Sequence, residues 1–123
     1  MPDNANEYAM LLPALDVKDG LTRVMNKKKL YWSLLGRFKM REMVETLNSA
    51  IASGEHEKVK EAAHAIKGAA GNLGCVTIRD MMLEVETRAK EQRSCADLGD
   101  EIMTALSDTE KSVTELLAMP FEP

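Results

Sequence analysis

Apolar residues recur along this chain at the spacing of an α-helix, and this repeat restricts its fold more than any other feature. Tyr31, Leu34, Leu35 and Phe38 lie at i, i+3, i+4 and i+7, so they share one helical face. Similar stripes lie within four later stretches, at residues 40–51, 59–73, 78–89 and 98–117. Aromatic residues make up only 4% of the chain, which disfavours β-sandwiches. These observations predict an all-α fold.

The boundaries of the first helices follow from polar residues and glycines. Asp16 can cap a short first helix that stops at the polar residues 26–29. A long helix, or two collinear ones, should then end near residue 53, where Gly54 is a plausible left-handed stop.

Two further helices are expected on either side of residue 75. One should run from about Glu55 to Leu73 or Gly74. Thr77 followed by Asp80 resembles a capping box, which would start the next helix.

The C-terminal part contains a linker and one last helix. Residues 93–97 form the predicted linker, and the helix should cover roughly 97–118 and stop before Pro120. Amphipathic helices of this length with short connections favour an antiparallel four-helix bundle, here with a short additional N-terminal helix.

Length and charge limit the domain organisation and the partners. We expect one domain over residues 13–118, a flexible segment over 1–12 and a C-terminal tail over 119–123. The net charge is −4 and no basic stripe with interleaved aromatics occurs, which disfavours nucleic acid and anionic membranes as partners. No apolar run approaches the roughly 18 residues of a spanning helix. We therefore expect a cytoplasmic, monomeric protein.

The two cysteines do not indicate a metal site. Cys75 and Cys95 are isolated, without Cys-x-x-Cys or Cys/His clustering, which argues against a zinc site and fits a reducing compartment.

The stretch HAIKGAAGNLG, residues 64–74, places three glycines in a predicted helix beside a histidine. Three glycines in a helix cost roughly 2–3 kcal/mol relative to alanine, so a function should compensate for them. With 100° per residue, the apolar side chains fall opposite His64, so the histidine is expected to face water. The core stripe consists of Val59, Ala62, Ile66, Ala70 and Leu73. The outward face carries Glu57, Lys60, Glu61, Lys67, Gly68, Gly71 and Cys75.

The glycines differ in their expected roles. Gly68 and Gly71 remove side chains next to His64 and leave bare backbone that a large partner can approach. Gly74 comes where the helix should end and is the expected C-terminal cap. Phosphate-binding glycine motifs are not present.

An exposed imidazole beside a lysine suits phosphoryl transfer. Neutral imidazole is nucleophilic near pH 7, and Lys67 can offset the charge of an incoming phosphoryl group. The chain shows neither a nucleotide-binding motif nor an acidic cluster for magnesium, so a partner must supply the donor's and acceptor's machinery.

These residues resemble the signature of histidine-containing phosphotransfer domains of bacterial phosphorelays. The resemblance covers roughly residues 13–117 and rests on His64 to Gly68, then Asn72 to Gly74, followed by Ile78, Met82, Val85 and Glu86. Upstream, the entry segment of the same domains is resembled by Asp16, Gly20, Leu21, Arg23, Tyr31, Leu34, Leu35 and Phe38. This resemblance implies that His64 is the phosphoacceptor and that Lys67 supports it electrostatically. Gly68 would leave the space that a partner needs to approach His64.

The same resemblance implies the partners. They would be response-regulator receiver domains and a hybrid sensor kinase, with no cofactor in this chain and magnesium only in the receiver. We take Lys60, Glu61, Gly68, Gly71 and Cys75 as candidate docking residues. The chain would be a phosphocarrier without its own ATP site and not an enzyme.

Three other functions remain open. The chain could be a helical scaffold whose histidine is never phosphorylated, or the phosphotransfer domain of a chemotaxis-type kinase. The phosphoacceptor segment of a sensor kinase fits less well, because Ala65 and Ala69 occupy the places of its acidic residue and proline.

Several residues receive a structural interpretation. Glu61 and His64 have the Glu-x-x-His spacing of di-iron bundles, but the chain lacks a second such pair. His56 is assigned no role, and Trp32 is expected to be buried. A solvated face is expected for the charged residues Glu84, Glu86, Arg88, Lys90 and Glu91.

Overall fold

The computed structural model describes residues 12–119, and all regular structure within them is helical, as predicted. The elements are α2 (Val17–Arg23), α3 (Lys28–Arg37), α4 (Met40–Ser53), α5 (His56–Asn72), α6 (Val76–Lys90), the 3-10 turn η1 (Ala96–Leu98) and α7 (Gly99–Leu117). Within the described residues, no helix is both long and apolar enough to cross a lipid bilayer.

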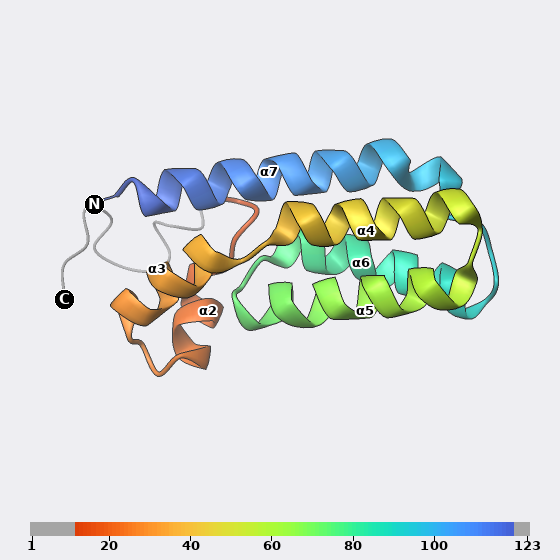
Figure 1. The fold of residues 1–123 in the computed structure, drawn as a ribbon. Helices are drawn as coiled ribbons and strands as arrows, with labels where there is room; N and C mark the ends of the chain where they lie inside the picture. The colour runs from red at the N-terminus through yellow and green to blue at the C-terminus, as the bar shows by residue number, and fades with distance from the viewer. Residues whose placement is uncertain (1–11, 120–123) are drawn as a thin grey trace.

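The four long helices α4 to α7 form the bundle, and α2 and α3 lie together at one of its ends (Figure 1). Most of the expected flexible segment 1–12 and of the expected tail 119–123 lies outside the described residues. Leu12 is an exception within the N-terminal segment, because its side chain is fully buried.

The stretch before residue 53 forms two helices instead of one. Phe38 takes an extended conformation, with φ −70° and ψ 113°, and so ends α3 before α4 begins. The two helices are inclined to each other in Figure 1, so the collinear arrangement expected from the sequence is wrong.

Glycines end α4 and α5, as predicted. Gly54 and Gly74 have φ values of 71° and 70°, the left-handed region in which residues other than glycine are strained. After α5, the amide of Cys75 donates to the carbonyl of Ala70 at 2.9 Å, which satisfies a carbonyl of the last turn.

The predicted capping box at the start of α6 does not form. The helix begins at Val76, one residue before Thr77, and no side chain caps it. Instead, the amide of Thr77 donates to the carbonyl of Ala14 at 3.4 Å. A carbonyl from the N-terminal segment thus takes the place of the expected side-chain cap.

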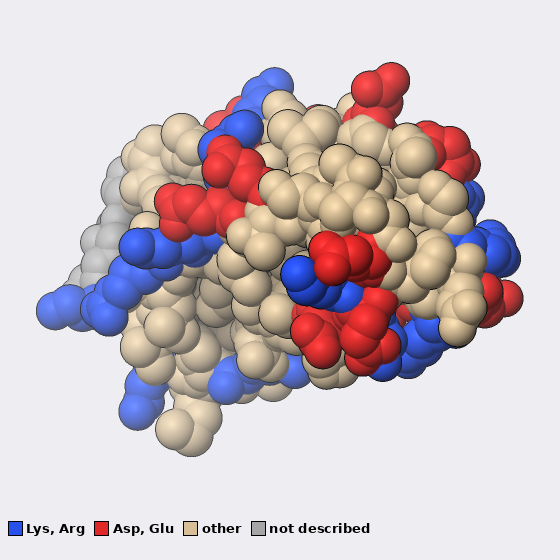
Figure 2. Space-filling view, turned by 45° about the vertical axis from the view of Figure 1, so that its right-hand side comes forward, with Lys and Arg blue, Asp and Glu red and all other residues tan. Residues whose placement is uncertain are grey.

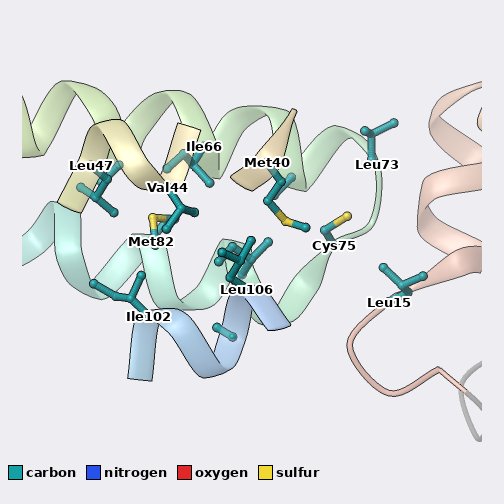
Figure 3. Close-up of a cluster of buried hydrophobic side chains, with 14 of the residues drawn as sticks. Leu15, Met40, Val44, Leu47, Ile66, Leu73, Cys75, Met82, Ile102 and Leu106 are labelled. Carbon is teal, nitrogen blue, oxygen red and sulfur yellow. The ribbon is translucent and has the colours of Figure 1, made fainter. Parts of the chain in front are cut away.

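The core lies between the four long helices (Figure 3). Val44, Ile66, Met82 and Leu106 come from different helices and are fully buried. Each helix therefore buries one apolar stripe against the other three, which leaves its outer face available for solvent or partners.

The α2–α3 end is fixed to the turn between α5 and α6. The Tyr31 hydroxyl donates to the Leu73 carbonyl at 2.7 Å, and the Asp16 amide donates to the Gly74 carbonyl at 2.7 Å. A Cβ atom at Gly74 would collide with the Asp16 carbonyl oxygen. Glycine is required here both for its backbone conformation and for this close approach.

Candidate functional site

His64 lies at the midpoint of α5 and projects away from the core. Its side chain is 72% exposed, whereas Val59, Ile66 and Ala70 on the opposite face are buried. Ala63 is also fully buried, while Ala62, which was expected in the core, is only half-buried. The predicted outward direction of the histidine is confirmed.

A buried carboxylate from α6 lies next to the exposed ring. Glu86 has a side chain that is 3% exposed, and its Oε2 is 2.7 Å from His64 Nδ1. Its other oxygen, Oε1, accepts a hydrogen bond of 2.7 Å from Lys67 Nζ. Lys90 Nζ lies 3.5 Å from the same Oε1. One carboxylate therefore joins the histidine to two ammonium groups.

The environment keeps Glu86 ionised. Burial by itself raises the pKa of a carboxyl group, but the hydrogen bonds from Lys67 and His64 and the charges of Lys67 and Lys90 outweigh it. The net result lowers the pKa of Glu86 to about 2. At neutral pH the group is an anion, and both of its oxygens can only accept hydrogen bonds.

The ionised carboxylate determines which ring nitrogen of His64 carries the proton. Because Glu86 can only accept, His64 must donate from Nδ1, which fixes the proton there in the neutral ring. The unshared electron pair is then on Nε2, the ring nitrogen that Glu86 does not contact. His64 Nε2 is therefore a nucleophilic nitrogen on an exposed ring whose orientation Glu86 fixes.

The charges around the ring favour an anionic reactant. Two ammonium groups, Lys67 and Lys90, surround one carboxylate, so the cluster beside His64 carries a net positive charge. Lys67 is half-buried, and its ammonium group bonds the same carboxylate as the imidazole. This arrangement can attract and partly neutralise a phosphoryl group.

The bare backbone beside His64 is open. A Cβ atom added at Gly68 would meet no atom of the protein within 4 Å, so packing does not require glycine at this position. At Gly71 the added atom would lie 3.6 Å from Arg79 Cδ, an ordinary contact. The outside of the helix is therefore unobstructed at Gly68, one turn beyond the histidine.

Three other candidate docking residues have different outcomes. On α5, Lys60 is half-buried and Glu61 is exposed. Lys60 Nζ forms an ion pair with Glu57 Oε1 at 3.0 Å. Cys75 was expected on the same outward face, and this is wrong, because it is fully buried. The helix ends before Cys75, because the left-handed Gly74 changes the direction of the chain. Burial raises the pKa of the Cys75 thiol to about 12. Cys75 is therefore not a docking residue.

Sequence reasoning missed two residues of α6. Glu86 was assigned to a solvated face, which is wrong, because it is buried against α5. A signal was present: Glu86 stands four residues after the core residue Met82 and directly after Val85. Leu83, one turn before Glu86, is apolar and 52% exposed. Between residues 12 and 119, no group of three His, Cys, Asp or Glu side chains could hold a metal ion.

Comparison with known proteins agrees with this geometry. Residues 37–116 match the family model of the Hpt domain, which covers well over half of the chain and includes all of α4, α5 and α6. No curated protein and no solved structure matched the chain. Hpt domains are histidine-containing phosphotransfer modules, phosphocarriers without an ATP site of their own. The chain belongs to the Hpt domain family.

Proposed function

We propose that His64 is the phosphoacceptor and that the protein is a phosphorelay intermediate. It takes a phosphoryl group from the aspartate of one receiver domain and passes it to the aspartate of another. The observation that carries this proposal is the hydrogen bond of 2.7 Å between Nδ1 of the exposed His64 ring and the buried Glu86. The upstream receiver would belong to a hybrid sensor kinase.

The transfer step uses the free electron pair on His64 Nε2. This nitrogen attacks the phosphorus of the receiver's acyl phosphate, the N–P bond forms, and the P–O bond to the aspartate breaks. The electron pair of that bond leaves with the aspartate, which becomes a carboxylate. The ring keeps its Nδ1 proton and becomes positively charged, and Glu86 stabilises this charge through the existing hydrogen bond. The reverse sequence delivers the group to the second receiver.

Two residues support the step without reacting. Glu86 is a positioning residue, since it fixes the proton and the orientation of the ring. Lys67 offsets the negative charge of the phosphoryl group as it approaches. The magnesium ion that phosphoaspartate chemistry needs is expected in the receiver, and we propose no cofactor for this chain.

The receiver must cover His64 to bring its aspartate within reach. Gly68 and Gly71 leave its path clear along α5, and Leu83 on α6 offers an exposed apolar contact. Lys60 and Glu61 lie on the other side of His64 along the helix and would form the polar rim.

The experiment is a transfer assay with purified proteins. The protein is incubated with a phosphorylated receiver domain and magnesium, and the product is tested for phosphate that is labile in acid and stable in alkali. We expect such phosphate in the wild type and none in His64→Gln. Its absence from the wild type, or its persistence in the variant, would defeat the proposal. Binding of receivers without transfer would favour the scaffold function instead.

A further inference from the structure

Lys90 is the second ammonium group beside Glu86, and the transfer step described above does not use it. Its Nζ lies 3.5 Å from Glu86 Oε1, the oxygen that also accepts a hydrogen bond of 2.7 Å from Lys67. Lys67 stands on α5, three residues after His64, whereas Lys90 is the last residue of α6. The two lysines that hold this carboxylate therefore come from different helices.

An ion pair at the surface does not by itself indicate a function. Several pairs of this protein are exposed on both sides, and Figure 2 shows Lys and Arg side chains beside Asp and Glu side chains at several places. Lys90 is itself 61% exposed, and exposed pairs contribute little to stability. A basic residue at the end of a helix also suits the macrodipole. These facts alone would give Lys90 only a structural role.

The partner of Lys90 distinguishes this pair from the exposed ones. Glu86 is buried, so water reaches little of its charge and the protein must compensate for it. Among the described residues, Lys90 is paired with no other carboxylate. Glu57 lines the same hollow as Lys90, but it is already paired with Lys60 at 3.0 Å. The charge of Lys90 is therefore directed at Glu86.

The charges of the transfer step explain why one lysine is not enough. The phosphoryl group brings about two negative charges to His64, as on other phosphorylated side chains. Lys67 has one positive charge, which it cannot give in full both to Glu86 and to the phosphoryl group. A buried carboxylate that loses its compensating charge is costly and tends to take up a proton. Glu86 would then no longer be a pure acceptor when the ring becomes positive.

We propose that Lys90 is a further positioning residue, which holds Glu86 as a carboxylate and in place while Lys67 turns to the phosphoryl group. This inference rests on the proposed function. Lys90 acts through Glu86 and not on the reacting atoms, since Glu86 Oε1 is the atom of the site that its ammonium group approaches. Lys67 thus follows the phosphate, and Lys90 preserves the acceptor of the Nδ1 proton.

The first test measures transfer from a phosphorylated receiver domain at saturating receiver concentration. We expect Lys90→Gln to lower the transfer rate constant about tenfold and to change the Kd of the receiver less than about twofold. Lys90→Arg keeps the positive charge and should restore the rate constant to within about twofold of the wild type. Lys58→Gln is the matched control and should change neither quantity, because Lys58 is similarly exposed (66%) and pairs with the exposed Glu55 at 3.2 Å.

A double-mutant cycle separates action through Glu86 from direct action on the phosphoryl group. Glu86→Gln removes the carboxylate charge, so in this background Lys90→Gln should change the transfer rate constant less than about twofold. Lys67→Gln in the same background should still lower it, because Lys67 acts on the phosphoryl group itself. Rapid-quench kinetics of the single and double variants measure both effects.

NMR shows whether Lys90 matters more once the phosphoryl group is present. The probe is the Nδ1 proton of ¹⁵N-labelled His64, before and after chemical phosphorylation of the protein with phosphoramidate. Without phosphate, this proton should exchange with water equally fast in the wild type and in Lys90→Gln, since Lys67 still holds Glu86. With phosphate, exchange should be about tenfold faster in Lys90→Gln. A purely structural role at the helix end predicts no difference between the two states.

Each other outcome rejects a specific statement. If the wild type accepts phosphate from no receiver, the proposed function fails. If it does accept phosphate and Lys90→Gln transfers it at the normal rate, only the role of Lys90 fails. A loss that persists in the Glu86→Gln background would make Lys90 a direct contact of the phosphoryl group, and a raised Kd alone would make it a contact of the receiver. Both results reject the positioning role.

Discussion

Helix α5 carries both histidines of the chain, and they differ in their neighbours more than in their own chemistry. His56 is the first residue of the helix and is half-buried in a hollow that Lys60 and Lys90 also line. Within the described residues it forms no hydrogen bond or ion pair with a carboxylate, whereas His64 bonds the buried Glu86.

The difference shows that the neighbouring helix makes a histidine into a candidate phosphoacceptor. Helix α6 runs back along α5 and presents a carboxylate at the middle of α5 but lysine at its start. The glycines after His64 then remove obstruction on the solvent side. Exposure alone is a property of many surface histidines, and only the combination supports phosphoryl transfer.

The largest expected effect separates the two histidines directly. His64→Gln should abolish phosphorylation by a phosphorylated receiver, whereas His56→Gln should change the rate by less than about twofold, because no reacting group is lost. Phosphate incorporation measured by gel or mass spectrometry checks both. Equal losses in the two variants would mean that the helix, and not His64, matters.

Removal of the carboxylate should make His64 resemble His56. We expect Glu86→Ala to lower the transfer rate constant about 100-fold, since the ring loses its fixed proton and the stabilisation of its developing charge. Glu84→Gln on the same helix, which breaks an exposed pair with Arg88, is the matched control and should have no effect. Rapid-quench transfer kinetics distinguish the two, and a normal rate in Glu86→Ala would remove Glu86 from the mechanism.

The pH dependence of stability should also reveal Glu86. Its folded-state pKa is lowered to about 2 from an ordinary 4.5, so its ionised form stabilises the fold above about pH 4.5. This contribution is lost as the pH falls from 4.5 towards 2. Between pH 7 and pH 3 we expect the wild type to lose about 2 kcal/mol more unfolding free energy than Glu86→Gln.

Urea unfolding at several pH values measures this difference. Glu84→Gln serves again as the control, because it leaves the buried carboxylate in place and should follow the wild type. Parallel pH curves for the wild type and Glu86→Gln would show that the His64–Lys67–Glu86 cluster does not hold the carboxylate ionised.

The smallest effect concerns the clearance beside His64. Gly68→Ala should raise stability by up to about 1 kcal/mol, because alanine favours a helix and nothing lies within 4 Å of the new methyl group. The same change should slow transfer about tenfold by separating the partners, an effect of roughly 1.4 kcal/mol. Gly99→Ala, where a Cβ atom is also unobstructed, is the control. Faster or unchanged transfer in Gly68→Ala would reject the clearance role.

The sequence was sufficient for most of α5. Helical periodicity places Val59, Ile66 and Ala70 in the core and His64 outside, and the structure agrees because a regular helix obeys 100° per residue along its length. The same rule failed for Cys75, because it lies after the left-handed Gly74, where the helical geometry no longer applies.

The parts that could not be predicted depend on contacts between distant segments. The spacing of Glu86 from the core residue Met82 indicates its burial, but only the packing of α6 on α5 brings its carboxylate next to His64 and Lys67. Likewise, no local pattern shows that the Ala14 carbonyl serves the start of α6 and makes the capping box at Thr77 unnecessary. Local rules gave the helices and their faces, while the electrostatics of the site required the tertiary structure.

The central claim is that Glu86 holds His64 so that its outer nitrogen reacts. The most direct measurement is NMR of the phosphorylated protein labelled with ¹⁵N-histidine, which identifies the ring nitrogen bound to phosphorus. We predict phosphate on Nε2 of His64, with the proton retained on Nδ1 and hydrogen-bonded to Glu86. Phosphate on Nδ1, or on any residue other than His64, would contradict it.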